Sequence, residues 1–404
     1  MKIAMVSEHA SPLAALGGVD AGGQNVHVAE LATELRRQGL EITVYTRRDS
    51  PDLPARVDMP GRVAVEHLDA GPPYAIPKDE LPPFLPELTA DLTERLMSDR
   101  PDVIHAHFWM SGLASLQAAA ATCCPVVQTF HALGVVKRRF QGAADTSPAN
   151  RLRCERMVAC EATRVIASST DERAELLRMG ADPARVDVVP SGVDLSLFGP
   201  VGPRAGRTAR YRLVSISRLV PRKGIDDAIR VTAQLPETEL LIAGGPEAGT
   251  FDDDPEVQRL RGLAADLGVA ERVRLLGSVD HQRLAPLIRS ADAVLCLPWY
   301  EPFGIVPLEA MACGVPVVAS AVGGLLDTVL PGSTGLHVRA RDPDHAAAAV
   351  RRLLADPATR RRMSRRGVER VARYAWEEVA GRVARCYLKA ALGVHRAATE
   401  EVAG

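Results

Sequence analysis

The 404-residue chain is longer than a single hydrophobic core usually supports, so two domains are expected. Its 47% hydrophobic and 25% charged content is that of an ordinary soluble globular protein, and the formal net charge of −1 gives no general attraction to nucleic acid or anionic membrane. No run of about 18 uninterrupted apolar residues occurs, which argues against a transmembrane helix. The seven cysteines show no metal-ligand spacing and are typical of reduced thiols in a cytoplasmic protein.

The first half of the chain alternates short runs of Val, Ile and Leu with amphipathic stretches such as 24–39, which ends at Gly39. This alternation predicts a parallel sheet covered by helices on both faces. The runs expected to form strands are 3–7, 41–46, 63–68, 102–107, 125–130, 164–169 and 186–192.

The pattern is interrupted at 198–212, a segment rich in Gly, Pro and Arg that is predicted to be an interdomain linker. A second series of strands follows at 213–218, 239–245, 272–278, 293–298, 316–320 and 335–338. The fold class is therefore α/β, with two doubly wound domains at 1–200 and 201–374 and a long helix at 375–404 that completes the first domain. Because ligands bind at the carboxyl ends of strands in such sheets, a cleft between facing domains is expected.

The stretch WYEPFGIVPLEAMACGVPVVAS, 299–320, places Glu301 and Glu309 on either side of a glycine turn and a helix start. A helix N-terminus with a glycine at its mouth is suited to bind a diphosphate. Glu301 would then lie beside a sugar and Glu309 beside a ribose. The backbone N–H groups expected to face the ligand are those of Phe303, Gly304, Ile305 and Val306. Spacing alone leaves open that the two glutamates are a helix-start charge and a solvent-facing residue.

The segment EPFGIVPLE resembles the E-x7-E pattern of retaining nucleotide-sugar glycosyltransferases of family 4, which have two facing Rossmann-like domains, the GT-B fold. Other segments resemble elements of that family in the same order, so that the match covers nearly the whole chain: DAGGQNVHVAELA, HAHFWMSG, TFHALG, VVPSGVD and SRLVPRKGID. Within the family, the resemblance is to the branch of the sucrose-phosphate synthases and the mycothiol-pathway enzyme that transfers N-acetylglucosamine to inositol 1-phosphate.

The resemblance implies donor-site roles for residues of both domains. Arg218 and Lys223 would bind the diphosphate, and Gly22 and Gly23 would let the backbone approach the donor phosphates or the acceptor closely. His131 would contact the sugar, so that the catalytic group comprises His131, Arg218, Lys223 and Glu301.

No metal site is expected, because cationic side chains and a helix N-terminus can stabilise a departing diphosphate. The acidic run 252–254 is predicted to be a solvated loop, and His105 and His107 are predicted to be packing or loop residues.

On the acceptor side, Asn25, Lys78 and Arg151 match positions that resemble the inositol-phosphate site of the mycothiol-pathway enzyme. Two positions depart, because Phe108 stands where that enzyme has Tyr and Ala132 where it has Thr. Each lost hydroxyl donor would cost about 1.5–3 kcal/mol against a phosphate dianion. Inositol 1-phosphate is therefore a doubtful acceptor, which leaves either another phosphate held by Lys78 and Arg151 or a different polar small molecule.

These features predict a retaining hexosyltransferase that uses a UDP- or GDP-linked sugar, needs no cofactor and acts on a small soluble acceptor, in a secondary-metabolite or low-molecular-weight thiol pathway. The alternatives are a nucleotide-sugar epimerase on the same fold, a non-catalytic sugar-nucleotide sensor and a membrane-surface enzyme with a lipid acceptor. The acidic segment DELPPFLPELTADLTERLMSDR lacks a basic amphipathic face, so no stable membrane anchoring is expected. No nucleic-acid partner is expected, and a homodimer is possible.

Overall fold

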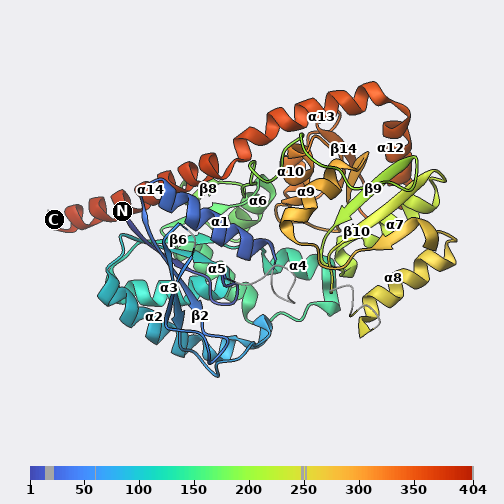
Figure 1. Cartoon of the computed structure of the whole chain (residues 1–404). Helices are drawn as coiled ribbons and strands as arrows, with labels where there is room; N and C mark the ends of the chain where they lie inside the picture. Colours follow the sequence, from blue (N-terminus) through green and yellow to red (C-terminus); the bar gives the residue numbers. More distant parts are fainter. Residues whose placement is uncertain (14–21, 60, 247–249, 251–252, 403–404) are drawn as a thin grey trace. The chain divides into compact units, whose positions relative to one another are not determined.

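The computed structural model describes residues 1–13, 22–59, 61–246, 250 and 253–402, with side chains up to residue 393. Its described residues form two compact units (Figure 1). Unit 1 runs to Gly192 and resumes at Trp376, and unit 2 is the continuous stretch Val193–Ala375. The first boundary lies at Gly192–Val193 rather than at residue 200, because Phe198 is buried in the core of unit 2.

Unit 1 contains an eight-stranded sheet in the order β3-β4-β2-β1-β5-β6-β7-β8. All neighbours are parallel except β3 and β4, which confirms the predicted parallel sheet. The short edge strand β3 was not predicted, because its residues are exposed or half-buried and form no apolar run. The strands are β1 Lys2–Val6, β2 Glu41–Arg47, β3 Arg56–Met59, β4 Val63–Leu68, β5 Val103–His107, β6 Val126–Thr129, β7 Arg164–Ala167 and β8 Val186–Val188.

Helices cover both faces of this sheet. Ile3 and Met5 of β1 pack in one core with residues of α1 and α14, which lie side by side in Figure 1. Ala4 and Val6 point to the opposite face and pack in a second core with α2 and α3. The helices of unit 1 are α1 Gly23–Arg37, α2 Leu85–Asp99, α3 Trp109–Thr122, α4 Gly134–Gln141, α5 Arg151–Glu161, α6 Thr170–Arg178 and α14 Trp376–Val402, with short 3-10 turns at Lys78–Glu80, Pro82–Phe84, Gly142–Ala144 and Pro183–Arg185.

Unit 2 contains a six-stranded, wholly parallel sheet in the order β11-β10-β9-β12-β13-β14. One face packs against α7, α8 and α12, and the other against α9 and α10. Its strands are β9 Tyr211–Ile216, β10 Thr238–Ala243, β11 Val273–Leu275, β12 Ala293–Cys296, β13 Val317–Ser320 and β14 Gly335–Val338. Its helices are α7 Ile225–Ala233, α8 Pro255–Asp266, α9 His281–Arg289, α10 Val306–Ala312, α11 Leu325–Thr328, α12 Pro343–Ala355 and α13 Pro357–Val371, with 3-10 turns at Pro221–Lys223, Ala270–Arg272 and Ala372–Tyr374.

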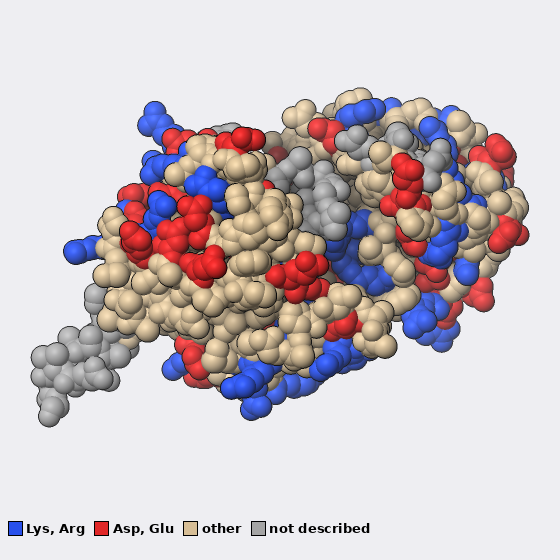
Figure 2. Space-filling model, turned by 90° about the horizontal axis from the view of Figure 1, so that it is seen from below, with Lys and Arg blue, Asp and Glu red and all other residues tan. Residues whose placement is uncertain are grey.

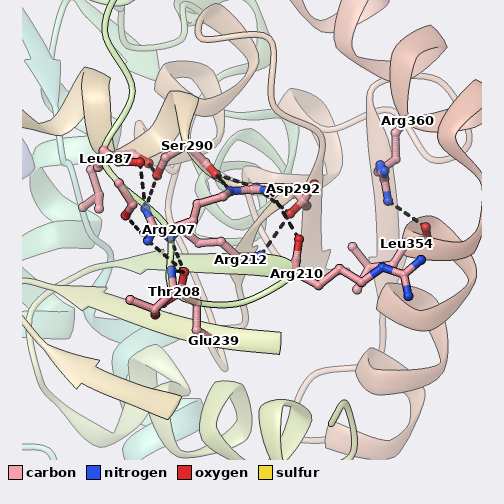
Figure 3. Close-up of polar contacts among 12 residues, drawn as sticks. Arg207, Thr208, Arg210, Arg212, Glu239, Leu287, Ser290, Asp292, Leu354 and Arg360 are labelled. Atoms are coloured by element: carbon pink, nitrogen blue, oxygen red, sulfur yellow. Dashed lines mark hydrogen bonds and ion pairs between the residues drawn. The ribbon is translucent and has the colours of Figure 1, made fainter. Parts of the chain in front are cut away.

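The segment 198–212 is not a free linker, so that prediction was wrong. Its arginines hold it against the amino-terminal ends of the unit 2 strands, and Arg212 itself lies in β9 (Figure 3). The Arg207 guanidinium donates to the Ser290 carbonyl and pairs with Asp292 at 2.6 Å. A composition of Gly, Pro and Arg therefore marks an ordered strap here.

The centre of this strap is a fully buried ion pair between Arg212 and Glu239, which are 0% and 2% exposed. Arg212 Nε donates to Glu239 Oε1 at 2.8 Å, and its Nη1 donates to the Ser290 hydroxyl at 2.8 Å. Although burial acts in the opposite direction, hydrogen bonds from Thr208 and Arg212 hold the pKa of Glu239 below its ordinary value. The pair therefore ties the start of β9 to the start of β10.

Among the described residues, no helix is both long enough and apolar enough to cross a membrane. The face drawn in Figure 2 carries Lys and Arg side chains interspersed with Asp and Glu rather than one continuous basic surface. This mixture agrees with the net charge of −1.

We predict that Glu239→Ala lowers the free energy of unfolding of unit 2 by about 3–5 kcal/mol, because it leaves the Arg212 charge buried without a partner. The loss should be full at neutral pH and should shrink as the pH falls through and below 4.5, where the wild-type carboxylate with its lowered pKa becomes protonated too. Chemical denaturation at several pH values measures both effects.

The matched control is Glu237→Ala, two residues earlier, which removes an exposed pair with Arg210 whose side chains are 60% and 64% exposed. This variant should unfold almost like the wild type. Equal losses for the two variants would contradict the role assigned to the buried pair.

Candidate functional site

Both sheets have a point at which the strand order reverses, and there the loops that leave two adjacent strands diverge. In unit 1 this point lies between β1 and β5, and in unit 2 between β9 and β12. Open α/β sheets bind ligands at such points, outside the carboxyl ends of the strands. Each unit therefore offers one candidate site.

In unit 2 the reversal point is occupied by a half-buried ion pair. Lys223 ends the 3-10 turn after β9, Glu301 follows β12, and Lys223 Nζ donates to Glu301 Oε2. The two side chains are 18% and 17% exposed. Burial lowers the pKa of Lys223, while Lys223 and Arg222 outweigh burial and lower the pKa of Glu301. The carboxylate thus stays charged and helps Lys223 to keep its proton.

Glycines allow the close backbone approach that places this pair. Gly224, at the start of α7, has φ of 68°, and a Cβ there would lie 2.0 Å from the carbonyl oxygen of Leu297. A Cβ on Gly323 would lie 2.1 Å from the carbonyl oxygen of Glu301. These contacts fix the backbone on the β12 side of the pair.

The second glutamate of the opening pattern is also buried, so the solvent-facing alternative for Glu309 was wrong. It is 5% exposed in α10, and its Oε1 lies 3.1 Å from His281 Nε2. The predicted tight entry is present, since Gly304 has φ of 85° and Pro307 stands in the first turn. The Phe303 ring packs into the unit 2 core, whereas Ile305 and Val306 are half-buried at the helix start.

Arg218 follows β9 on the same side of the sheet as Lys223, and its side chain is exposed. Of the acidic run 252–254, residue 252 lies outside the described residues. Asp254 accepts backbone hydrogen bonds from Glu256 and Val257 at the start of α8, which is the work of a helix cap.

In unit 1, His131 stands in a strained turn at the carboxyl end of β6. Its φ is 60°, and the Ala132 N–H donates to the Phe130 carbonyl at 2.7 Å, which closes a γ-turn of the rare positive-φ kind. Phe108, after the adjacent strand β5, has φ of 81°. Strained non-glycine residues that are held by their surroundings cluster at functional sites.

A buried brace holds this turn from behind. Arg151 Nη2 donates to the Ala132 carbonyl at 2.9 Å, and Arg151 Nε donates to Glu155 at 2.7 Å. Glu155 also accepts from the Gly134 N–H, and burial raises its pKa against the effect of Arg151. Arg151 and Glu155 are 3% and 0% exposed. The predicted acceptor residue Arg151 thus shapes the His131 turn.

The structure brings three of the predicted acceptor residues together. The Arg151 guanidinium lies 5.0 Å from the centre of the Phe108 ring and binds the backbone of Ala132. Arg151 also lines a cavity of about 220 Å³ together with Gly134, Arg138, Asp145 and Ser147. Lys78 lies in the 3-10 turn Lys78–Glu80 of the same unit.

The glycine-rich loop ends in an ordered helix start, although its residues 20 and 21 lie outside the described part of the chain. Asn25 Oδ1 accepts from the Gly22 N–H at 3.0 Å, and its Nδ2 donates to the Ser11 carbonyl at 2.9 Å. Asn25 is 4% exposed and therefore holds Gly22 and Gly23 in place.

The sequence missed polar residues that meet at the unit 1 reversal point. Glu8 is 2% exposed, accepts from the Ser111 N–H at 3.1 Å and lies 2.7 Å from His9 Nδ1. Glu8 and His9 could have been found from the sequence, because they are polar residues that directly follow the predicted strand 3–7. His27 gave none, because a single histidine on an amphipathic helix has no distinctive spacing.

Four histidines gather beside this point. His105 uses both ring nitrogens, with Tyr387 at 2.7 Å and Thr129 at 2.9 Å, as a packing residue does. His107 Nδ1 and His131 Nε2 share a hydrogen bond of 2.9 Å. Burial lowers the pKa of His27 to about 4 and holds the pKa values of His107 and His131 well below the ordinary value. His131 is therefore neutral at pH 7 and suited to hydrogen bonding.

Comparison with known proteins agrees with this architecture. Residues 21–197 match the family described as Glycosyltransferase Family 4, and residues 205–370 match Glycosyl transferases group 1. The chain is 39% identical to D-inositol 3-phosphate glycosyltransferase of Frankia alni over 94% of its own length and 97% of the relative's. It is 37% identical to the enzyme of that name from Mycobacterium avium, over 96% and 94%.

Among solved structures, a sucrose-phosphate synthase from Thermosynechococcus elongatus superposes with a TM-score of 0.88 at 34% identity, covering 96% of this chain and 98% of that one. Anabaena HepE, solved with UDP, has a TM-score of 0.74 at 21% identity over 95% and 99%, which shows a shared fold. The chain belongs to the family 4 and group 1 glycosyltransferases of GT-B fold, and it is a glycosyltransferase.

Proposed function

We propose that the chain transfers a hexose-type sugar, with retention of anomeric configuration, from a UDP- or GDP-linked donor to a small polar acceptor. The observation that carries the proposal is the Lys223–Glu301 pair at the reversal point of unit 2. The similar proteins support the proposal. By their names, D-inositol 3-phosphate glycosyltransferases and a sucrose-phosphate synthase act on small polar compounds.

In this proposal the donor diphosphate binds beside Lys223 and Arg218, and the α10 start supplies backbone N–H groups. A half-buried cation that is already oriented by Glu301 can stabilise the negative charge that develops on the leaving diphosphate without reorganising. Glu309 lies beside His281, and in this proposal it accepts hydrogen bonds from donor hydroxyl groups on the other side of the turn. No cofactor is needed for this chemistry.

We propose that His131 contacts the sugar as a neutral hydrogen-bonding residue. Transfer of the sugar would pass through an oxocarbenium-like transition state. Retention would follow from departure and attack on the same face of the sugar, with the diphosphate accepting the proton of the acceptor hydroxyl. The test is the NMR assignment of the anomeric configuration of donor and product. Inversion would contradict the retaining assignment, and turnover of donor without an acceptor would indicate an epimerase.

For the acceptor we propose a small polar molecule that carries no phosphate group for the site to bind tightly. Arg151 donates hydrogen bonds to Glu155, Ser147 and the Ala132 carbonyl. Its positive charge is therefore already compensated by the Glu155 carboxylate. Phe108 contributes a ring face beneath that guanidinium where the related enzyme has a hydroxyl donor.

We predict that Lys223→Ala and Glu301→Gln each lower kcat by at least about 100-fold, the usual loss when one preorganised charge partner is removed from a transition state. A donor-consumption assay with purified variants measures this. The control is Lys389→Ala, which removes a 53%-exposed lysine paired with Asp187 in unit 1 and should leave turnover unchanged. The double variant Lys223→Met with Glu301→Gln removes the charges without leaving one buried alone, so it separates lost chemistry from lost folding. Unchanged turnover in both single variants would overturn the donor-site assignment.

We also predict that one nucleoside diphosphate stabilises the protein against heat more than the corresponding monophosphate. At 100 times its Kd, a ligand that binds only the folded state adds about 2.7 kcal/mol. Thermal unfolding with UDP, GDP and ADP, and with their monophosphates, identifies the base. The shift should shrink in Lys223→Ala, and equal curves with every nucleotide would contradict nucleotide binding at this site.

Finally, Phe108→Tyr combined with Ala132→Thr should raise kcat/KM for inositol phosphate by about tenfold or more per restored donor, since each charged hydrogen bond is worth about 1.5–3 kcal/mol. Activity with unphosphorylated inositol serves as the control and should not rise. If the wild type already prefers the phosphorylated acceptor and the variant gains nothing, the proposed acceptor class is wrong.

A further inference from the structure

Three histidine side chains from separate parts of unit 1 converge on one point. His27 lies in α1, His107 ends β5 and His131 forms the turn after β6. One ring nitrogen from each lies within 4.8 Å of the others. The rings of His27 and His131 are centred 5.0 Å apart, and those of His107 and His131 are 5.2 Å apart.

The spacing of these nitrogens approaches that of a metal site. His107 Nδ1 and His131 Nε2 are 2.9 Å apart, whereas adjacent ligands of a tetrahedral zinc ion at 2.0–2.1 Å stand about 3.3 Å apart. A shift of a few tenths of an ångström would let an ion replace the shared proton. The ligand nitrogen of His27 lies within 4.8 Å of the other two.

An unsatisfied atom points to a missing partner. Within the described structure His107 Nε2 is buried and has no hydrogen-bond partner, although buried polar atoms are nearly always paired. His105, the nearest other ring, has both nitrogens occupied by Tyr387 and Thr129 and cannot serve. An ion that His107 bound through Nε2 would supply this partner, whereas an ion bound through Nδ1 would leave Nε2 unpaired.

The surroundings support a ligand role for the three rings. His27 Nδ1 lies 2.9 Å from the Ser191 hydroxyl, an outer contact of the kind that orients metal-bound imidazoles. The Trp376 ring, 5.4 Å from that of His27, forms an apolar wall.

The set contains imidazoles and no carboxylate or thiolate, which suits zinc, copper and nickel rather than magnesium or calcium. Three protein ligands leave one position of a tetrahedral ion for water or an anion. His131 is partly exposed while His27 and His107 are buried, so an ion would enter past His131.

We propose that His27, His107 and His131 bind one divalent ion of the zinc class, and that this ion reversibly inhibits sugar transfer by taking His131 away from its substrate. The binding part of the proposal rests on the geometry of unit 1 alone. The inhibitory part also rests on the proposed role of His131.

Cobalt(II) is the first probe, because a tetrahedral imidazole site gives it an intense visible spectrum that octahedral aqueous cobalt lacks. Titration of the wild-type chain should produce this spectrum with saturation at one ion per chain, and zinc should displace it. Equilibrium dialysis with zinc should give the same stoichiometry. Weak, unsaturable uptake without the tetrahedral spectrum would overturn the site.

Two variants locate the ion. His27→Phe should weaken cobalt and zinc binding more than about tenfold, as loss of a ligand or its support does. The matched control is His67→Gln, which alters another buried histidine of unit 1 whose Nδ1 lies 2.7 Å from the Pro54 carbonyl. It should bind the ions as the wild type does. Circular dichroism and thermal unfolding check that both variants fold, and His131→Phe provides a second ligand variant. Wild-type affinity in both ligand variants would disprove the assignment.

The activity experiment separates this proposal from the proposed function. Zinc should inhibit sugar transfer by the wild type and His67→Gln, a chelator should restore it, and His27→Phe should need at least tenfold more zinc for the same fractional inhibition of its own metal-free rate. If no acceptor supports transfer, the cobalt and dialysis results still decide the site. If zinc binds at one ion per chain but leaves the transfer rate unchanged, the inhibitory part is wrong.

Discussion

The two sheets are built almost wholly from parallel strands, and each parallel strand can return only through a helix that crosses a face of the sheet. All carboxyl ends of the parallel strands therefore meet at one edge, and the residue that follows each strand is brought beside its neighbours. This constraint places His131 next to Phe108 in unit 1, and Lys223 next to Glu301 in unit 2. The polar residues proposed to carry the chemistry lie at those edges because the strands themselves are apolar.

Charges buried in such a frame need partners, and three of the ion pairs described above differ in what they hold. Arg212–Glu239 lies at the amino-terminal ends of strands and is fully enclosed, so its work is to hold the backbone. Arg151–Glu155 is equally enclosed and shapes the turn of His131. Lys223–Glu301 keeps about a sixth of each side chain exposed, which makes it the pair of the three best able to receive a ligand.

Much of the fold could be predicted from the sequence, because central parallel strands read as continuous Val, Ile and Leu runs. The edge strand β3 escaped because it is half-exposed, and 198–212 was misread because arginines that bind a sheet end look like those of a solvated linker. The E-x7-E spacing located Glu301 and Glu309. The cluster of His27, His107 and His131 could not be predicted from the sequence, because the strand order alone brings these residues together.

The return of α14 to unit 1 sets the order in which the chain can be completed on the ribosome. Unit 2 is continuous, so all of its core has been synthesised before Trp376 emerges. The core of unit 1 is completed only after α14 has been synthesised, because Val379, Val383 and Tyr387 belong to that core. Tyr387 also hydrogen-bonds to His105 beside the histidine cluster. The unit whose synthesis begins first is therefore completed last. A nascent chain cannot form the contact between His105 and Tyr387 until the whole of Val193–Ala375 has been synthesised.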